Sequence, residues 1–290
     1  MDEKDFEIIL SLFELKNITK TSEKLFMTQP ALTSRIKKIE EDLGAPILLR
    51  SKKGVIFTPI GESIIPYMRD MTANMRQMRD HVCINHDSVE GTLRIGASVN
   101  FARYKLPQYL KKYLHDFPKV DVNILTEKSV TLHKLIQRNE ISVAVLRGEF
   151  KWDEGKKRLS TEPICLVSQE KLSREQLRDT LYIGHKSDSV LQGQINDWYR
   201  NNIGSEEKAK IWVDSIDACL ALVRNGIGWA ILPEICLEKF TGYRENLYFA
   251  DGSPFVRNTY IFYKHAYIDL PQVDLFIRYL MDMEIDSVDA

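Results

Sequence analysis

The chain has 290 residues, of which 44% are hydrophobic, and its formal net charge is -1. This composition excludes a disordered chain, and the length predicts about two domains. No apolar run approaches the roughly 18 residues of a membrane span, and the charged segment Met1–Asp5 does not resemble a secretory signal. We therefore expect a cytoplasmic protein that has no membrane partner.

The cysteines carry no metal-binding pattern. Cys83, Cys165, Cys219 and Cys236 are far apart, form no Cys-x-x-Cys pair and have no histidine at ligand spacing. Buried, reduced thiols are expected, and a redox switch between two of them is the alternative. The sequence predicts no metal site, no cofactor and no catalytic residues.

A basic segment lies near the N-terminus, although the net charge alone argues against a nucleic-acid partner. Between Lys16 and Lys53 there are nine basic and four acidic residues, an excess of +5. A local basic patch of this kind is what phosphate binding requires.

The first two helices are predicted from apolar spacing and capping residues. Residues 6–15 fit a buried helix, which Asn17 can end. Thr19 is expected to cap the second helix, with Leu25 and Phe26 facing inward.

The third helix begins after Thr28, its predicted cap, with Pro30 in the first turn, and ends at Gly44. Its apolar residues at helical spacing are Ala31, Leu32, Ile36, Ile39 and Leu43. The polar residues that it presents away from this stripe are Gln29, Thr33, Ser34, Arg35, Lys37 and Lys38.

Those polar side chains are typical of a recognition helix that enters a DNA groove. Gln can pair with adenine and Arg with guanine, Thr and Ser can touch thymine methyls or phosphates, and Lys neutralises phosphate charge. We expect Arg35→Ala to weaken sequence discrimination and Lys37→Ala to lower the affinity for all sequences. The alternative is an amphipathic helix with a solvated polar face.

A basic hairpin is predicted directly after this helix. Residues 47–57 read as two short strands around the turn-forming tip Lys52–Lys53–Gly54. A basic hairpin beside a helix-turn-helix is a wing that lies along phosphates or reaches the minor groove, with Arg50 as the natural probe.

A long helix is predicted from Thr58 and Pro59, which supply a cap and a first-turn proline. Its apolar stripe is Ile60, Ile64, Ile65, Met68, Met71, Met75, Met78 and Val82. Spacings of three and four predict a coiled-coil-like dimer contact, which would present two DNA-binding units to a two-fold site. The alternative is a helix that covers its own domain's core. The polar stretch 85–91 predicts a hinge.

These residues together resemble the DNA-binding module of LysR-type transcriptional regulators. The similarity runs from Ala31–Glu40 through Leu43–Gly44 and Leu49–Arg50 to Thr58–Glu62. One departure is Thr21–Ser22, where this family usually carries a pair of alanines. More weakly, the segments 91–96, 117–120 and 226–233 look like the family's effector domain.

The remainder of the chain predicts a two-lobed α/β domain. The predicted strands are 93–97, 120–125, 141–146, 164–168, 181–183, 211–213 and 229–232. The predicted helices are 106–117, 130–138, 191–202 and 216–224. Alternation of strands and helices favours parallel sheets in doubly wound units, and two lobes imply a cleft.

The resemblance implies a periplasmic-binding-protein-like effector domain, whose last helix, 271–283, packs on the first lobe. The expected domains are a winged helix-turn-helix at 1–58, a linker and dimerisation helix at 59–89, and an effector domain at 90–290. Its first lobe would comprise about 91–162 and 267–290, and its second about 163–266.

Candidate effector-binding residues lie where strands end and helices begin, because small ligands bind at the carboxyl ends of strands. Arg147 is the most informative, since a guanidinium among hydroxyls binds a carboxylate well. The alternative is a surface arginine paired with Glu149, and Ser98 and Ser129 have the alternative role of helix caps. The full expected set is Ser98, Asn100, Phe101, Ser129, Arg147, His185, Asp214 and Ser215, with Ser187 as a weaker candidate.

The sequence thus predicts a transcriptional regulator that binds double-stranded DNA as a homodimer or homotetramer under control of a small anionic effector. One alternative is a DNA-binding protein whose large domain serves only oligomerisation. An enzyme fused to a DNA-binding module is disfavoured, because no catalytic motif is found. Gly226–Ile227–Gly228 lacks the third glycine of a dinucleotide site and reads as a tight approach to a buried strand.

Overall fold

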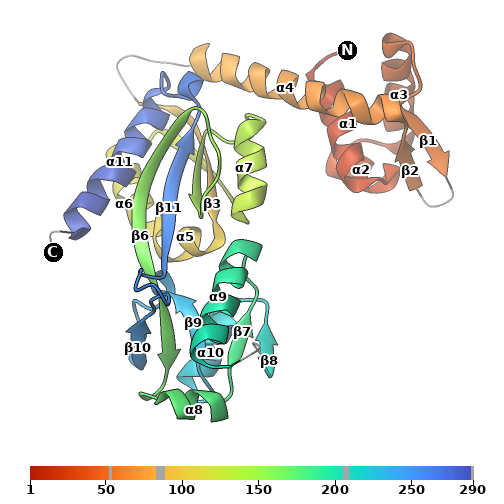
Figure 1. Ribbon diagram of the computed structural model, residues 1–290. Coiled ribbons are helices and arrows are strands. Elements are labelled where there is room, and N and C mark those ends of the chain that lie inside the picture. The colour runs from red at the N-terminus through yellow and green to blue at the C-terminus, as the bar shows by residue number, and fades with distance from the viewer. Residues whose placement is uncertain (52–53, 83–88, 205–208, 289–290) are drawn as a thin grey trace.

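The chain forms a small winged helical domain and a two-lobed α/β domain, joined by the long helix α4 (Figure 1). The structure is a computed structural model that describes residues 1–51, 54–82, 89–204 and 209–288. The predicted hinge at 85–91 falls largely outside the described residues.

The winged domain contains three helices and a two-stranded hairpin. Its elements are α1 (Glu3–Leu15), α2 (Ile18–Lys24), α3 (Gln29–Leu43), β1 (Leu48–Ser51) and β2 (Gly54–Phe57). Apolar residues at helical spacing form its core, including Ile8, Ile9, Leu12, Leu32, Ile36, Ile39, Ile47 and Phe57. Thr28 caps α3 by accepting a bond from the Ala31 N–H at 3.3 Å, and Gly44 closes the helix in the left-handed conformation, as predicted.

Two local predictions for this domain are wrong. Asn17, not Thr19, caps α2, because its side chain accepts a bond from the Lys20 N–H at 3.0 Å. Phe26 faces solvent instead of the core, since the chain turns between α2 and α3 with Phe26 in the left-handed region. Ala31 and Leu43 also lie at the surface.

Helix α4 (Pro59–Val82) begins at the base of the wing. The Thr58 hydroxyl accepts a bond from the Gly61 N–H at 3.0 Å, which caps the helix as predicted. A Cβ on Gly61 would lie 2.2 Å from the Ile47 carbonyl oxygen, so only glycine allows this approach of helix and wing.

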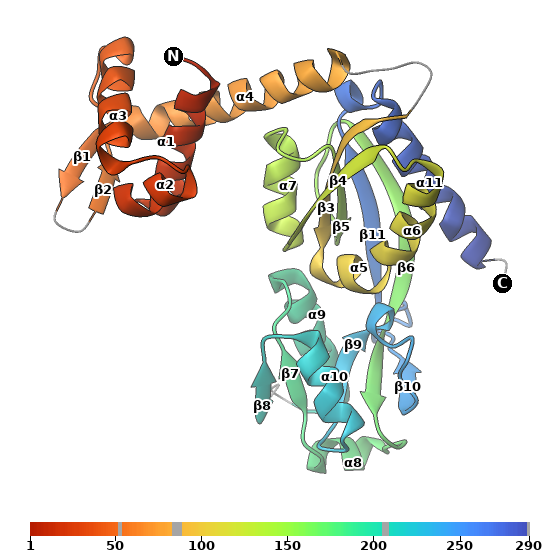
Figure 2. The same ribbon diagram turned by 180° about the vertical axis from the view of Figure 1, so that it is seen from behind.

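The first lobe is a mixed sheet with helices on both faces (Figure 2). Its strands are β3 (Gly91–Ser98), β4 (Val120–Glu127), β5 (Val143–Arg147), the first part of β6 (Gly155–Ser168) and β11 (Val256–Tyr263). Its helices are α5 (Val99–Tyr104), α6 (Leu106–Asp116), α7 (Ser129–Gln137) and α11 (Pro271–Val288). Helices α6 and α11 cover one face and α7 covers the other.

The second lobe is smaller and is built on the end of β6. The strands β9 (Ala230–Pro233) and β10 (Tyr243–Asn246) pair with residues 164–168 of β6, while β7 (Ile183–His185) pairs with β8 (Ile211–Val213). The helices are α8 (Arg174–Asp179), α9 (Ser189–Asn202) and α10 (Ile216–Arg224), and a short 3-10 turn lies at Glu234–Cys236. A second 3-10 turn, His265–Tyr267, follows β11 and packs in the first-lobe core.

One strand of the first lobe, β11, runs antiparallel to its neighbours, where the sequence predicted a parallel sheet. β11 pairs with β5 and with residues 155–163 of β6, whereas β3, β4 and β5 are parallel. The return to the first lobe therefore comes at Val256 and not near 267. The first half of β6 was not predicted because Gly155–Glu162 contains many polar residues and forms no apolar run.

Candidate nucleic-acid interface and effector site

Helix α3 presents the predicted polar side chains on one open face. Thr28, Gln29, Pro30, Ser34, Lys37 and Lys38 are exposed and Thr33 is half-buried. Lys37 is 80% exposed and lies 3.7 Å from Glu41 one helical turn later. The Gln29 amide donates to the Thr19 hydroxyl at 3.1 Å, which orients it from α2. These polar side chains are therefore accessible on the surface of α3.

Arg35 is placed differently from the sequence prediction. Its guanidinium binds Asp5, at 2.5 Å from Nε to Oδ1, and also contacts Asp2. These ion pairs raise the pKa of Arg35 and lower that of Asp2. Asp2 and Asp5 also form a capping box at the start of α1. The ion pairs of Arg35 tie α3 to the start of α1.

Phe26 is a surface feature that the sequence prediction missed. Its side chain is 98% exposed and its φ angle is 52°, a region that costs a residue with a Cβ roughly 1–2 kcal/mol. It lies in the turn before α3, three residues before Gln29. The signal available in the sequence was its position in a short turn between two helices.

The Thr21–Ser22 departure from the family pattern is accommodated within α2. Both residues are buried, and their hydroxyls donate to the carbonyls of Asn17 and Thr19 at 2.8 Å. Because each hydroxyl is satisfied inside the helix, the pair packs as small residues would.

The wing forms as predicted between β1 and β2, which pair antiparallel from Leu48–Phe57 to Ser51–Gly54. Its tip residues Lys52 and Lys53 lie outside the described residues, as does the side chain of Arg50. A hollow of about 460 Å³ lies between the wing and α3, and its lining includes Thr33, Ser34, Lys37 and Leu48.

The predicted stripe of α4 divides into two faces. Ile65 and Met68 are buried in the winged-domain core. Ile60, Tyr67, Met71 and Met78 are between 50% and 67% exposed. From Tyr67 onward the exposed residues lie at spacings of four and seven, which places them along one side of the helix. One side of α4 therefore covers the winged-domain core, and a neighbouring side is left exposed.

The end of β3 contributes one buried hydroxyl to the boundary between the lobes. Ser98 is 6% exposed, and its Oγ has no hydrogen-bond partner among the described residues. Asn100 is half-buried. Phe101, predicted to contact the effector, instead packs in the first-lobe core, stacked on Tyr109 with ring centroids 5.8 Å apart.

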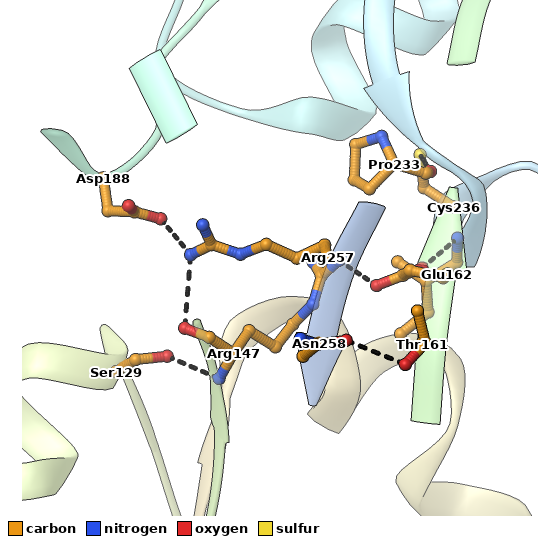
Figure 3. Close-up of polar contacts among 10 residues, drawn as sticks. Ser129, Arg147, Thr161, Glu162, Asp188, Pro233, Cys236, Arg257 and Asn258 are labelled. Carbon is orange, nitrogen blue, oxygen red and sulfur yellow. Dashed lines mark hydrogen bonds and ion pairs between the residues drawn. The ribbon is translucent and has the colours of Figure 1, made fainter. Parts of the chain in front are cut away.

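Arg147, at the end of β5, pairs with Glu162 and not with Glu149. Glu162 also accepts a bond from the Ile235 N–H at 2.6 Å, which links β6 to the second lobe (Figure 3). Burial raises the pKa of Glu162, and the Arg147 charge opposes this. Ser129 does not cap α7; its hydroxyl accepts a bond from the Arg147 N–H at 3.0 Å.

Arg257 is a second buried arginine beside Arg147, and the sequence analysis did not select it. Its guanidinium binds the Asp188 carboxylate and donates to the Arg147 carbonyl oxygen at 3.2 Å (Figure 3). Burial lowers the pKa of Arg257, which Asp188 counteracts. Because β11 was not predicted as a strand, nothing in the sequence indicated that this residue would lie next to Arg147.

His185, in the second lobe, is 2% exposed, and neither ring nitrogen has a hydrogen-bond partner among the described residues. Burial lowers its pKa to about 4, so the ring is neutral at pH 7. Thr259, which lies opposite Arg147 on the neighbouring strand, is 1% exposed. Its hydroxyl and the Nε of Arg147 also have no hydrogen-bond partner among the described residues. The neighbouring Ser187 donates to the Gln192 side chain at 3.1 Å.

Asp214 is exposed and Ser215 half-buried at the start of α10. Ser215 occupies the cap position without a side-chain bond. A further polar link between the lobes is made instead by Asp217, which accepts from the Tyr104 hydroxyl at 2.5 Å and pairs with Arg103 at 2.5 Å. Burial and Asp217 raise the pKa of Tyr104.

Cys165, Cys219 and Cys236 are free and buried, and burial raises the pKa of each thiol to about 12. These three thiols are thus buried and free, as the sequence predicted, and a thiol held neutral is a poor nucleophile. Cys83 lies outside the described residues. Over the described ranges, no three His, Cys, Asp or Glu side chains gather as a metal site, and no helix has the length and apolar character to cross a membrane.

Comparison with known families matches both parts of the chain. Residues 4–62 match the bacterial regulatory helix-turn-helix protein, lysR family, and residues 86–284 match the LysR substrate binding domain. The chain belongs to the LysR family of transcriptional regulators, which bind DNA in a sequence-specific manner and carry an effector-binding domain.

Similar proteins span the whole chain. The uncharacterized regulator YraN of Bacillus subtilis (strain 168) is 35% identical over 99% of this chain and 100% of its own length. YkuM of the same organism is 30% identical over 98% of both chains. The crystal structure of CbnR, a LysR family transcriptional regulator, has a TM-score of 0.68 at 16% identity, covering 97% of this chain and 98% of its own. A structure of full-length CbnR with target DNA gives a TM-score of 0.67 at 17% identity, covering 98% and 100%.

Proposed function

We propose that this regulator reads a two-fold DNA site through a pair of α3 helices, and that a small anionic effector bound between the lobes controls it. The observation that carries the effector assignment is a cluster of buried polar groups at the lobe boundary. It contains two arginines and the unpartnered side-chain atoms of Ser98, Arg147, His185 and Thr259.

The DNA-reading surface is assigned to the open face of α3. Gln29, Thr33 and Ser34 are the candidates for base contact, with Thr28 and Pro30 at the helix start. Lys37 and Lys38 are assigned to phosphates, together with Arg50, Lys52 and Lys53 of the wing. Phe26 adds an apolar contact beside Gln29, since it is fully exposed and would lose water on meeting a sugar or a thymine methyl.

Dimerisation is assigned to the exposed face of α4. Ile60, Tyr67, Met71 and Met78 face away from the winged-domain core, which already holds Ile65 and Met68. A second copy of α4 placed against this face would bury it and set the distance between the two α3 helices. Full-length CbnR has been solved with its target DNA. By family membership we assign double-stranded DNA and a homodimer or homotetramer to this chain.

We assign effector binding, and not catalysis, to the boundary between the lobes. Burying a polar atom without a partner is costly, and such atoms recur where a ligand supplies the missing bond. A large domain that served only for oligomerisation would have no reason to keep several of them beside two arginines. A DNA-binding regulator also acts in the compartment that holds its DNA, which we take to be the cytoplasm.

The DNA assignment is tested by the salt dependence of binding to the chain's own upstream DNA. The Lys37→Ala, Lys38→Ala double variant should bind more weakly to all sequences, and its log–log salt slope should fall by about 0.9 for each lost phosphate contact. Lys239→Ala, at an exposed lysine of the second lobe, is the matched control. If the double variant keeps the wild-type slope, α3 is not the phosphate-binding helix.

A further inference from the structure

The ion pair of Asp188 and Arg257 crosses the boundary between the two lobes (Figure 3). Arg257 belongs to β11, which is hydrogen-bonded into the first-lobe sheet. Asp188 caps α9 of the second lobe, where its Oδ1 accepts from the Leu191 N–H at 3.1 Å and its Oδ2 accepts from Arg257. One carboxylate therefore ties the start of α9 to the sheet of the other lobe.

The two arginines at this boundary are balanced by carboxylates of different character. Glu162, the partner of Arg147, is 11% exposed and is held at its second oxygen by the Ile235 N–H. Asp188, the partner of Arg257, is 38% exposed, while the Arg257 side chain is only 8% exposed. Asp188 is thus the carboxylate that can leave toward solvent, whereas the guanidinium it would leave is fixed inside.

Unpartnered groups lie on the strands and loop that meet at this pair. Thr259 lies two residues after Arg257 on β11 and directly opposite Arg147 on β5, so the three side chains share one side of the sheet. His185 is the last residue of β7 and precedes Asp188 by three residues. The Oγ of Thr259, the Nε of Arg147 and both ring nitrogens of His185 have no hydrogen-bond partner among the described residues.

We propose that Asp188 is an internal substitute for the effector's carboxylate, and that a carboxylate effector displaces it from Arg257. This rests on the proposed function and names the ligand class of the same site: a small carboxylate that carries a second hydrogen-bonding group. The exchange replaces one carboxylate by another, so no charge is left buried and unpaired. The second group of the ligand then bonds to the hydroxyl, imidazole or guanidinium atoms that lack a partner.

Displacement of Asp188 also supplies the regulatory step. When Asp188 leaves Arg257, α9 is no longer held to β11, and the two lobes can take another arrangement. A ligand shifts the lobes only by its difference in affinity for the two arrangements, and here that difference is the loss or retention of the Asp188–Arg257 pair.

Acetate, the smallest simple carboxylate that carries a methyl group, tests the exchange directly. The Asp188→Ser variant keeps a helix-capping hydroxyl but frees Arg257. Sodium acetate should raise its thermal midpoint above that in sodium chloride of equal ionic strength. The effect should need roughly tenfold less acetate than in the wild type, because the internal competitor is gone. Asp197→Ser, on the exposed side of α9, is the matched control and should respond as the wild type does.

A second substitution assigns the acetate effect to Arg257. The Asp188→Ser, Arg257→Met variant replaces the buried pair by a hydroxyl and an apolar chain of similar length, a change that proteins commonly tolerate. It should lose the acetate-specific rise. If Asp188→Ser responds equally to acetate and chloride, or if the double variant keeps the acetate effect, the exchange is refuted.

The regulatory step is tested on DNA with no small molecule added. Asp188→Asn keeps the cap on α9 but removes the charge that binds Arg257, so its footprint on the upstream DNA should differ in length or bending from that of the wild type. Asp197→Asn should leave the footprint unchanged. An unaltered footprint of Asp188→Asn would refute the regulatory step. Failure of the wild-type protein to bind the upstream DNA would instead refute the proposed function itself.

Discussion

The burial of His185 predicts a pH dependence of stability that a substitution at this one residue should remove. The imidazole is 2% exposed, has no hydrogen-bond partner among the described residues, and has its pKa lowered from 6.5 to about 4 by burial. In the unfolded chain the ring takes up a proton as the pH falls below about 6.5, whereas in the folded chain it stays neutral until about 4.

The sign and size of the effect follow from this difference. Stability contributed by the neutral ring is fully present above pH 6.5 and is lost as the pH falls toward about 4. Each pH unit in that window removes about 1.4 kcal/mol from the free energy of unfolding, so that going from pH 6.5 to pH 5 removes about 2 kcal/mol. Carboxylates titrate in the same window, so the comparison of interest is between the wild type and a variant.

His185→Phe keeps the ring and removes the titration. Urea unfolding followed by tryptophan fluorescence reports chiefly on the second lobe, which contains Trp198, Trp212 and Trp229. From about pH 7.5 to pH 5 the variant should lose about 2 kcal/mol less than the wild type. His115→Phe, at an 87% exposed histidine, is the control. Equal losses in His185→Phe and in the wild type would show that His185 is not held neutral by burial.

Three further substitutions test separate parts of the molecule. Phe26→Asn should leave the thermal midpoint unchanged or higher, because Asn tolerates the left-handed conformation, yet lower the affinity for DNA roughly fivefold; unchanged affinity would remove Phe26 from the interface. Met71→Glu should turn dimers into monomers in sedimentation, whereas Val190→Glu, equally exposed but off α4, should not; dimers in both would place the contact elsewhere. Gly61→Ala should destabilise the winged domain by about 1–3 kcal/mol, because its Cβ would meet the Ile47 carbonyl oxygen; wild-type stability would contradict that packing.

The winged domain was largely predictable because its signals are local. Capping by Thr28, the proline in the first turn and the left-handed Gly44 each depend on residues within one turn of the helix end. The predictions that failed there, for Phe26 and for the cap of α2, concern the turns at the two ends of α2, whose shapes depend on how α2 packs against α1 and α3.

The effector site was predictable only in part. Ser98, Ser129, Arg147 and His185 were found because they follow predicted strands or begin a helix. Arg257 and Thr259 were missed, since β11 pairs with strands that lie about a hundred residues earlier in the chain and its residues alternate between the two faces. Phe101 lies in α5 beside Asn100, but it packs against Tyr109 in the first-lobe core.

The sequence by itself determined that this chain carries a winged helix-turn-helix with a basic helix, a long linker helix and an α/β domain in two lobes. Capping, periodicity and local charge specify these elements without reference to distant residues. Tertiary structure alone decided which charges pair: Arg35 with Asp2 and Asp5, Arg147 with Glu162, and Arg257 with Asp188. An ion pair depends on the distance between two side chains in space, and that distance is fixed only when segments far apart in the chain pack together.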